Sequence, residues 1–177
     1  MVAAFHVGKV PPAIPSILDE LDVGLREAGW LLSLVNFTAA LGGMVIALTV
    51  DRFGHRRLIV LGTALCCAAS LAGAFAQTID LLLVFRFFEG LGFIVVTVSV
   101  PTLVLRVTAL ADRHRAMTIW TSYMPAGAGA MMLIAAAILP LTSWRAAWLV
   151  ASGASLVMLL ALLLHAVPRH GVQQQRQ

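Results

Sequence analysis

The sequence predicts an all-α fold, a polytopic helical bundle that crosses a membrane several times. Of its 177 residues, 60% are hydrophobic and only 11% are charged, and the mean hydropathy is +0.95. Soluble domains carry about 25% charged residues. The charges also cluster between long apolar runs, as at positions 51–57, where five residues are ionisable. Such clusters predict short, hydrated loops between membrane-spanning helices.

The first stretch, residues 1–18, is apolar but is interrupted by Lys9 and by three prolines. A span needs about 20 apolar residues, so we expect a partial first span whose beginning lies outside the sequence. A polar connection over residues 18–28 follows. Five longer runs are each long enough to cross a bilayer; they are residues 29–50, 58–76, 81–105, 116–139 and 146–167. These runs predict a six-span unit over residues 1–167 and a polar tail over residues 168–177.

The loops between these runs are short, so neighbouring spans should be antiparallel. Most arginines then share one side of the membrane, which the positive-inside rule makes cytoplasmic. We expect a multi-pass protein of the cell (inner) membrane with a cytoplasmic C-terminus. The arginines on that side are Arg52, Arg56, Arg57, Arg106, Arg113, Arg115, Arg169 and Arg176, against Arg26 and Arg145 on the other side.

The composition also limits the partners and the chemistry. A pI of about 10 would fit nucleic-acid binding, but the basic residues lie beside apolar runs, where they face lipid headgroups. The lipid bilayer is therefore the expected partner, and nucleic acid is not. Cys66 and Cys67 are adjacent, which suits neither a disulfide nor a structural metal site. The chain has no His-Glu-x-x-His pair, Gly-x-Ser-x-Gly elbow or P-loop, so we expect no cofactor, no metal and no enzymatic activity.

The charged loop at 51–57 opposes the helix dipoles on both of its sides. Asp51 falls at the negative end of one helix and Arg56 near the positive end of the next, each unfavourable by about 0.3–1 kcal/mol when exposed. Arg52 and Arg56 can neutralise Asp51. Gly54 allows the positive φ that a tight reversal needs.

This loop resembles the connection between the second and third spans of the major facilitator superfamily, whose pattern is Gly-x-x-x-Asp-Arg-x-Gly-Arg-Arg/Lys. The matching residues are Asp51, Arg52, Gly54 and Arg56. Ala47 replaces the leading glycine and His55 replaces an arginine; Gly43 and Ala47 also give the helix a small-residue face for close packing. The resemblance implies that Asp51 and Arg52 latch one state of a transporter against its other half. The alternative is a basic loop that only sets topology.

A second match lies at 86–92, which reads Arg-Phe-Phe-Glu-Gly-Leu-Gly. It is similar to the superfamily's fourth-span pattern Arg-Phe-x-x-Gly-x-Gly through Arg86, Gly90 and Gly92, and the resemblance implies that Arg86 takes part in proton coupling or binds substrate charge. Glu89 stands on the same helix face, three residues after Arg86, where the pattern is variable. An ionisable residue inside a span costs a few kcal/mol unless it is paired or hydrated, so it is a functional candidate. The alternative is a structural Arg–Glu pair.

The position of Lys9 in the first span predicts a contact with Glu89 in the fourth. At about 1.5 Å per residue, Lys9 and Glu89 lie at similar depths from the same side of the membrane, roughly 13 Å in, so we expect them to meet. With Arg86 they leave one net positive charge, which suits a small anion with Glu89 as a candidate proton carrier; Asn36 in the second span is polar enough to line the same path. Residues 6–15 also resemble the first span of the cyanate- and nitroimidazole-type transporters. Alternatively, Lys9 snorkels to the interface.

The fifth and sixth spans carry packing signals. Pro125 and Gly127 predict a helix bend beside small residues that allow close packing, a role also expected of the glycines at 90 and 92. The run at 124–129 resembles the glycine- and proline-rich fifth span of superfamily antiporters, but its glycines are out of register, so we infer no antiport. Trp144 and Trp148 predict an aromatic anchor at the membrane interface.

Taken with the resemblance, these features favour a secondary active transporter. We expect it to move a small solute, a small anion with proton coupling, by alternating access against a second six-span half. The alternatives are a drug/proton antiporter of the same superfamily, a half-size protein that dimerises, and a non-transporting membrane bundle or inactive truncated fragment.

Overall fold

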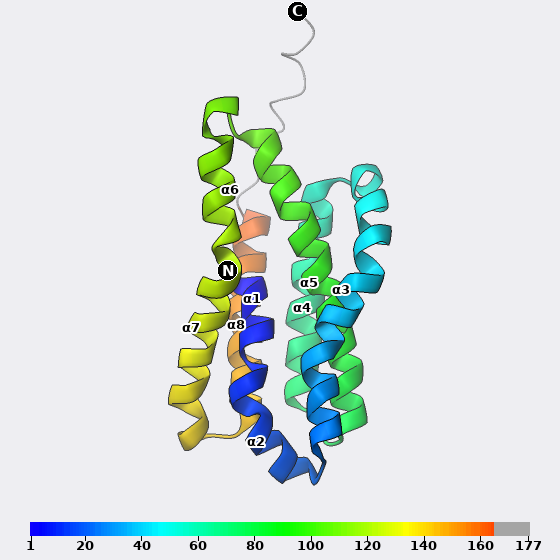
Figure 1. Ribbon diagram of the computed structural model, residues 1–177, viewed down its shortest axis with the longest axis vertical. Coiled ribbons are helices and arrows are strands. Elements are labelled where there is room, and N and C mark those ends of the chain that lie inside the picture. Colours follow the sequence, from blue (N-terminus) through cyan, green and yellow to red (C-terminus); the bar gives the residue numbers. More distant parts are fainter. Residues whose placement is uncertain (165–177) are drawn as a thin grey trace, which may run out of the picture.

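The computed structural model describes the backbone of residues 1–164, and the side chains of these residues except 44, 45 and 47–53. Every regular element in this part is helical, which confirms the all-α prediction (Figure 1). The predicted tail at 168–177 lies outside the described residues. The elements are α1 (Val2–Gly8), α2 (Val10–Leu21), α3 (Leu25–Phe53), α4 (His55–Ala74), α5 (Ile79–Val107), η1 (Leu110–Asp112), α6 (Arg113–Thr121), α7 (Tyr123–Ile138), η2 (Leu139–Leu141) and α8 (Trp144–Leu164).

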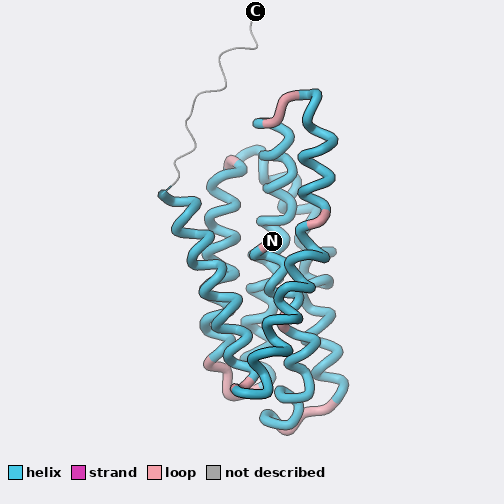
Figure 2. Tube along the Cα trace, turned by 90° about the vertical axis from the view of Figure 1, so that its left-hand side faces the viewer, coloured by secondary structure: helices cyan, strands magenta, loops and turns pink. Residues whose placement is uncertain are grey.

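The helices run side by side along one long axis, and their connections gather toward its two ends (Figures 1 and 2). α1 and α2 follow a single path, as do α6 and α7, so the described chain makes six passes. α5 packs against α3 and α4, α4 also packs against α8, and α1 contacts both α7 and α8. Four described segments are long and apolar enough to cross a membrane: His55–Ala74, Ile79–Val107, Leu110–Leu141 and Trp144–Leu164.

The hydrogen-bond ladder of the first pass is interrupted at Lys9, between α1 and α2, although the Lys9 backbone itself stays in the right-handed helical region. Pro11 and Pro12 explain this interruption, because they have no N–H to donate to the carbonyls four residues earlier. α2 continues to Leu21 and stops where Asp22 adopts a left-handed conformation, with φ of 50°. The connection to α3 is therefore residues 22–24, shorter than the predicted 18–28.

The predicted fifth span, 116–139, is two helices that meet at Ser122. Pro125 lies in the first turn of α7, where it donates no hydrogen bond and its ring crowds the carbonyl of Thr121. The expected bend is therefore a helix boundary. The remaining passes also differ from the expected bounds: α3 begins at Leu25, α5 covers Ile79–Val107 and the described part of the last pass ends at Leu164.

The turn between α3 and α4 depends on Gly54, whose φ is 82°. This is the positive φ that the sequence predicted at this glycine. The side chains of Asp51, Arg52 and Ala47 lie outside the described residues, so the latch prediction stays a prediction.

Three of the expected packing glycines lie where helices approach closely. A Cβ on Gly92 would lie 2.7 Å from the carbonyl oxygen of Gly62, which places α5 directly against α4. A Cβ on Gly90 would lie 3.0 Å from Thr38 Cβ, and one on Gly127 would lie 2.5 Å from the Met1 carbonyl oxygen. Gly43 differs, because its Cβ would meet its nearest neighbour, Ile94 Cδ1, only at 3.9 Å, an ordinary contact.

The tryptophan pair is in the core rather than at the interface, which corrects the expected aromatic anchor. Trp144 and Trp148 are 0% and 1% exposed, and their rings meet edge to face with centroids 5.1 Å apart. The neighbouring Arg145 pairs with Glu20 of α2 and donates to the carbonyl of Ala76, 3.0 Å away, after α4. Arg145 therefore connects the start of α8 with the ends of α2 and α4.

Candidate functional site

The centre of the candidate site is Glu89, whose two carboxylate oxygens each accept from a cation. Lys9 Nζ donates to Oε1 at 2.5 Å, and Arg86 Nη1 donates to Oε2 at 2.5 Å. Lys9 and Glu89 are 0% exposed and Arg86 is 2% exposed. The predicted meeting of Lys9 with Glu89 at one depth is confirmed. We call these three residues, with His6, the charge cluster.

Lys9 has two further partners that fix its position. Its Nζ donates to Ser70 Oγ of α4 at 2.7 Å, and Ser70 in turn donates to the main-chain oxygen of Trp148 at 3.0 Å. The same Nζ lies 4.4 Å from the centroid of the Trp148 ring, a cation–π contact. The break between α1 and α2 occurs at Lys9 itself, and the residue is held inside the bundle rather than at the interface, which argues against snorkelling.

Arg86 is held by main-chain oxygens as well as by Glu89. Its Nη1 donates to the carbonyl of His6 at 2.5 Å, and its Nε donates to the carbonyl of Leu31 at 3.3 Å. The His6 carbonyl is among the last four of α1, which have no partner within that helix. The early end of α1 thus supplies an acceptor to a buried guanidinium that needs several.

His6 belongs to the charge cluster, although the sequence analysis assigned it no role. Its Nδ1 lies 3.4 Å from Glu89 Oε1, and its Nε2 lies 2.8 Å from Ser155 Oγ of α8. The ring is 0% exposed. The spacing of His6 and Lys9, three residues apart and therefore on one helix face, is the signal that could have indicated it.

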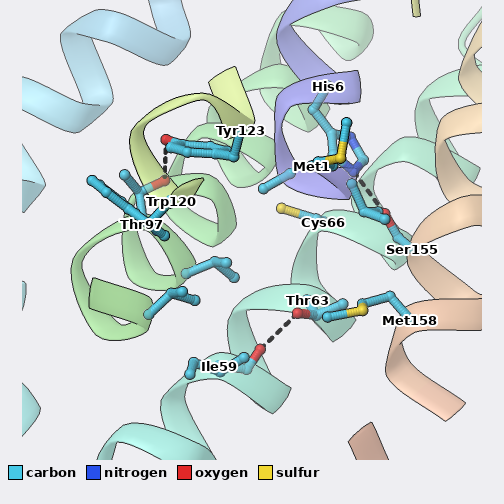
Figure 3. Close-up of a pocket in the computed structure, with 14 residues that line it drawn as sticks. Met1, His6, Ile59, Thr63, Cys66, Thr97, Trp120, Tyr123, Ser155 and Met158 are labelled. Atoms are coloured by element: carbon cyan, nitrogen blue, oxygen red, sulfur yellow. Dashed lines mark hydrogen bonds between the residues drawn. The ribbon is translucent and has the colours of Figure 1, made fainter. Parts of the chain in front are cut away.

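A cavity of about 140 Å³ adjoins the charge cluster (Figure 3). His6 and Ser155 belong to both, whereas Lys9, Arg86 and Glu89 do not line the cavity. Most of the lining is apolar, with polar atoms from side chains such as Thr97, whose Oγ1 lies 3.5 Å from Tyr123 Oη. The remaining lining residues are Met1, Val2, Ala3, Ile59, Thr63, Cys66, Val96, Val100, Trp120, Tyr123 and Met158.

One residue predicted for this site, Asn36, is not brought to the charge cluster. Asn36 is exposed on α3 and is not among the residues that line the cavity. Arg56 was predicted for the 51–57 loop, where its pairing with Asp51 stays a prediction because the side chain of Asp51 lies outside the described residues. Arg56 is exposed, and its Nη2 donates to the carbonyl of Leu162 at 3.1 Å. That carbonyl is in the last turn of α8, so the guanidinium complements the negative end of this helix.

The charge cluster gives each ion a partner where an unpaired ion would be expensive. Removing a carboxylate or an ammonium from water costs several kcal/mol per ion unless hydrogen bonds and opposite charge compensate. Glu89 supplies the opposite charge for both cations, and oxygens of Ser70, His6 and Leu31 supply further acceptors. Because these groups come from α1, α3, α4 and α5, a change at Glu89 acts on the contacts of several helices at once.

A sequence profile of the Major Facilitator Superfamily matches residues 1–177. The chain belongs to this superfamily. The match agrees with the resemblance at the 51–57 loop and at the 86–92 run, and it places the chain in a family of multi-pass membrane transporters rather than enzymes.

Superfamily members of several kinds are similar to the chain. The methyl viologen resistance protein SmvA of Salmonella typhimurium is 29% identical over 163 residues, 89% of this chain and 32% of SmvA. A D-xylose transporter of Levilactobacillus brevis is 28% identical over 102 residues, 58% of this chain and 22% of the relative. A lincomycin resistance protein of Streptomyces lincolnensis is 35% identical over 94 residues, 52% and 19% of the two chains. The chain therefore spans a third or less of these relatives.

Solved superfamily structures share the fold. The proton:xylose symporter XylE superposes with a TM-score of 0.77 at 13% identity, covering 92% of this chain and 42% of XylE. An inward-open structure of XylE from E. coli gives a TM-score of 0.75 at 14% identity, covering 93% and 46%. The described helices thus have the architecture of a membrane transporter bundle, and the chain spans less than half of XylE.

Proposed function

We propose that this chain is the N-terminal six-span half of a secondary active transporter that moves a small solute, coupled to protons, by alternating access. The observation that carries the proposal is the buried Glu89 carboxylate, bonded to Lys9 and Arg86 beside a cavity. An ionisable side chain inside a membrane span costs several kcal/mol of free energy, and such residues typically mark a substrate or proton pathway.

The coupling step follows from the hydrogen bonds of Glu89. An ionised Glu89 binds both cations and holds α1 against α5. When a proton adds to one carboxylate oxygen, the group becomes neutral and the two cations lose their shared counter-charge. The contact between α1 and α5 then weakens, which allows the helices to move as alternating access requires.

His6 provides the route for that proton. It touches Glu89 Oε1 through Nδ1, and through Nε2 it touches Ser155, which lines the cavity with it. An imidazole accepts a proton at one nitrogen and releases one from the other. A proton from the cavity therefore reaches the carboxylate through one side chain.

A small anion is the substrate that the charges favour. While Glu89 is ionised it occupies both cations, so an anion gains little by approaching them. Protonation of Glu89 leaves Lys9 and Arg86 with two uncompensated positive charges, and an entering anion restores the balance. This coupling admits one anion with one proton. The resemblance of residues 6–15 to the cyanate- and nitroimidazole-type transporters supports the same class of small solute.

A drug/proton antiporter is the second candidate, and the lining of the cavity favours it. Trp120, Tyr123 and Met158 present aromatic and polarisable surface, which suits an apolar or aromatic solute. Among the relatives are lincomycin and methyl viologen resistance proteins. In this mode the proton on Glu89 exchanges with the solute instead of accompanying it.

The same proposal includes a second six-span half, packed against this chain. A second six-span half would cover apolar side chains that this chain leaves exposed, such as Ile119, Leu133 and Val157, which are 73%, 75% and 68% exposed. Residues 1–167 form the first half, the arginine-rich end faces the cytoplasm, and Asp51 with Arg52 latches the two halves in one state. A non-transporting bundle would keep the charge cluster only for packing.

Solute uptake distinguishes these functions. Vesicles containing this chain, alone or together with a second six-span half, are given labelled cyanate or a labelled small carboxylate under an imposed pH gradient. The proposal expects uptake only with both halves present, and loss of uptake in Lys9→Met and in Arg86→Gln. Gradient-driven export of an aromatic cation without anion uptake would support the antiporter, and movement of neither solute would count against both forms.

A further inference from the structure

A second hollow lies outside the charge cluster, on the surface of the bundle between α4 and α8. It has a volume of about 370 Å³ and is lined by Arg56, Arg57, Val60, Leu61 and Leu163. We call it the α4–α8 groove. Among the described residues, the groove and the cavity beside His6 have no lining residue in common, and the proposed path of the proton and the solute does not pass through the groove.

The groove is polar at one end and apolar along its length. Arg56 and Arg57 stand in the first turn of α4 and are exposed, while Val60 and Leu61 follow one turn deeper. Leu163, from the last turn of α8, forms the opposite wall and is 55% exposed; Leu61 is 63% exposed. Two guanidinium groups therefore stand at the helix end, above a strip of aliphatic surface.

Arg56 is already oriented across this groove. Its Nη2 donates to the carbonyl of Leu162 in α8 at 3.1 Å, so the guanidinium bridges the two helices. A guanidinium has five N–H donors, and one such bond leaves others for a ligand. Its planar fork matches phosphate oxygens, and the positive N-terminal end of α4 adds to the attraction for an anion.

We propose that the α4–α8 groove binds an anionic phospholipid. Its phosphate pairs with Arg56 and Arg57, and the adjoining acyl chain lies along Val60, Leu61 and Leu163. Along α4, the charged groups lie at the end of the helix and the aliphatic side chains lie further in. A phospholipid has the same order, with its phosphate at the membrane surface and its acyl chains below. None of the lining residues that the structure describes carries a negative charge, so these residues favour an anionic headgroup over a zwitterionic one, which carries its own cation. A bound lipid would bridge α4 and α8, as Arg56 already does.

The test is local crosslinking of a lipid. The full-length protein is placed in nanodiscs of phosphatidylcholine with a small fraction of phosphatidylglycerol that carries a photoactivatable group on its acyl chain. Crosslinked residues are mapped by mass spectrometry. We expect crosslinks at residues 60, 61 and 163, with displacement by unlabelled phosphatidylglycerol but not by phosphatidylcholine.

Arg57→Gln is the decisive variant, because it removes one charge and leaves the bond of Arg56 to Leu162 intact. Crosslinking at the groove should fall about fivefold, the effect of one arginine at an anionic membrane surface. The matched control is Arg115→Gln, an exposed arginine in the first turn of α6 that does not line the groove; it should leave groove crosslinking unchanged. Circular dichroism of both variants checks that the helices are retained.

Three results would overturn the proposal. Crosslinks spread evenly over the outer faces of the bundle would indicate general contact with lipid. An equal loss in Arg57→Gln and Arg115→Gln would indicate diffuse attraction rather than a site. Displacement of the labelled lipid by inorganic phosphate alone would indicate a small-anion site that does not need an acyl chain. None of these outcomes depends on whether the protein transports a solute.

Discussion

Lys9 and Glu89 are 80 residues apart in the sequence, yet Lys9 Nζ lies 2.5 Å from Glu89 Oε1 inside the bundle, with both side chains closed to solvent. The pair joins the break between α1 and α2 to the middle of α5. Its geometry makes the stability of the bundle and the proposed coupling depend on the same carboxylate. Substitutions can separate the effect of this carboxylate on bundle stability from its effect on proton coupling.

Removal of Lys9 should destabilise the bundle. Lys9→Met keeps much of the side-chain volume but leaves Glu89 with one cation instead of two. Glu89 keeps Arg86 as its partner, but Glu89 Oε1 and Ser70 lose the hydrogen bonds from Lys9, and unsatisfied buried polar groups cost about 1–3 kcal/mol. We expect a lower unfolding temperature in detergent, measured by intrinsic tryptophan fluorescence. The double variant Lys9→Met with Glu89→Gln should be less stable still, because it leaves the buried Arg86 without a counter-charge; a double variant more stable than Lys9→Met would contradict the ion-pair account.

His6→Gln should slow proton-driven transport with little effect on stability. A glutamine offers hydrogen bonds in place of those to Glu89 and Ser155, but it cannot carry a proton between them. Loss of a positioned proton carrier typically costs about a hundredfold in rate. The measurement is solute uptake under an imposed pH gradient. His114→Gln, at an exposed position on α6, is the control, and equal rates in the two variants would exclude the relay.

Gly92→Ala should force α4 and α5 apart. The added methyl would lie 2.7 Å from the Gly62 carbonyl oxygen and from Cys66 Sγ, and such overpacking costs about 1–3 kcal/mol. Gly153→Ala in α8 is the matched control, because nothing lies within 4 Å of its Cβ position, so it should gain up to about 1 kcal/mol of helix stability. Equal unfolding temperatures for the two variants would show that the α4–α5 contact tolerates a Cβ.

Asp51→Asn tests the proposed latch. We expect it to reduce the uptake rate more than the yield of folded protein, because the residue sits at the helix end where only the switch between states should need its charge. Size-exclusion chromatography gives the folded yield, and initial uptake gives the rate. Asp112→Asn, in the exposed η1 turn, is the control. Wild-type uptake in Asp51→Asn would remove the latch from the account.

Much of the fold follows from local properties of the sequence. Long apolar runs predict the helices, and the glycine in a charged loop predicts the positive φ at Gly54. The meeting of Lys9 and Glu89 was predictable from helix rise alone, because antiparallel spans of known length place residues at comparable depths. The superfamily resemblance rested on two short motifs, and the match over residues 1–177 agrees with it.

The rest of the site depends on which helix faces meet, which a single sequence does not specify. Ser70 and Ser155 read as ordinary span residues until α4 and α8 turn them toward Lys9 and His6. Trp144 and Trp148 read as interfacial because tryptophan is common there, but packing of α8 on α4 and α1 buries them. Asn36 was predicted from polarity alone, and polarity does not determine which side of α3 faces inward.

The measurement that tests the central claim most directly is solute-driven proton movement in vesicles that contain both halves of the transporter. Addition of the transported anion, with no imposed gradient, should change the pH inside wild-type vesicles as protons enter with the solute. Glu89→Gln should abolish the pH change, whereas Asp80→Asn, exposed in the first turn of α5, should keep it. Proton movement that persists in Glu89→Gln would contradict the account, because the proton would then be carried by a group other than the carboxylate that Lys9 and Arg86 hold.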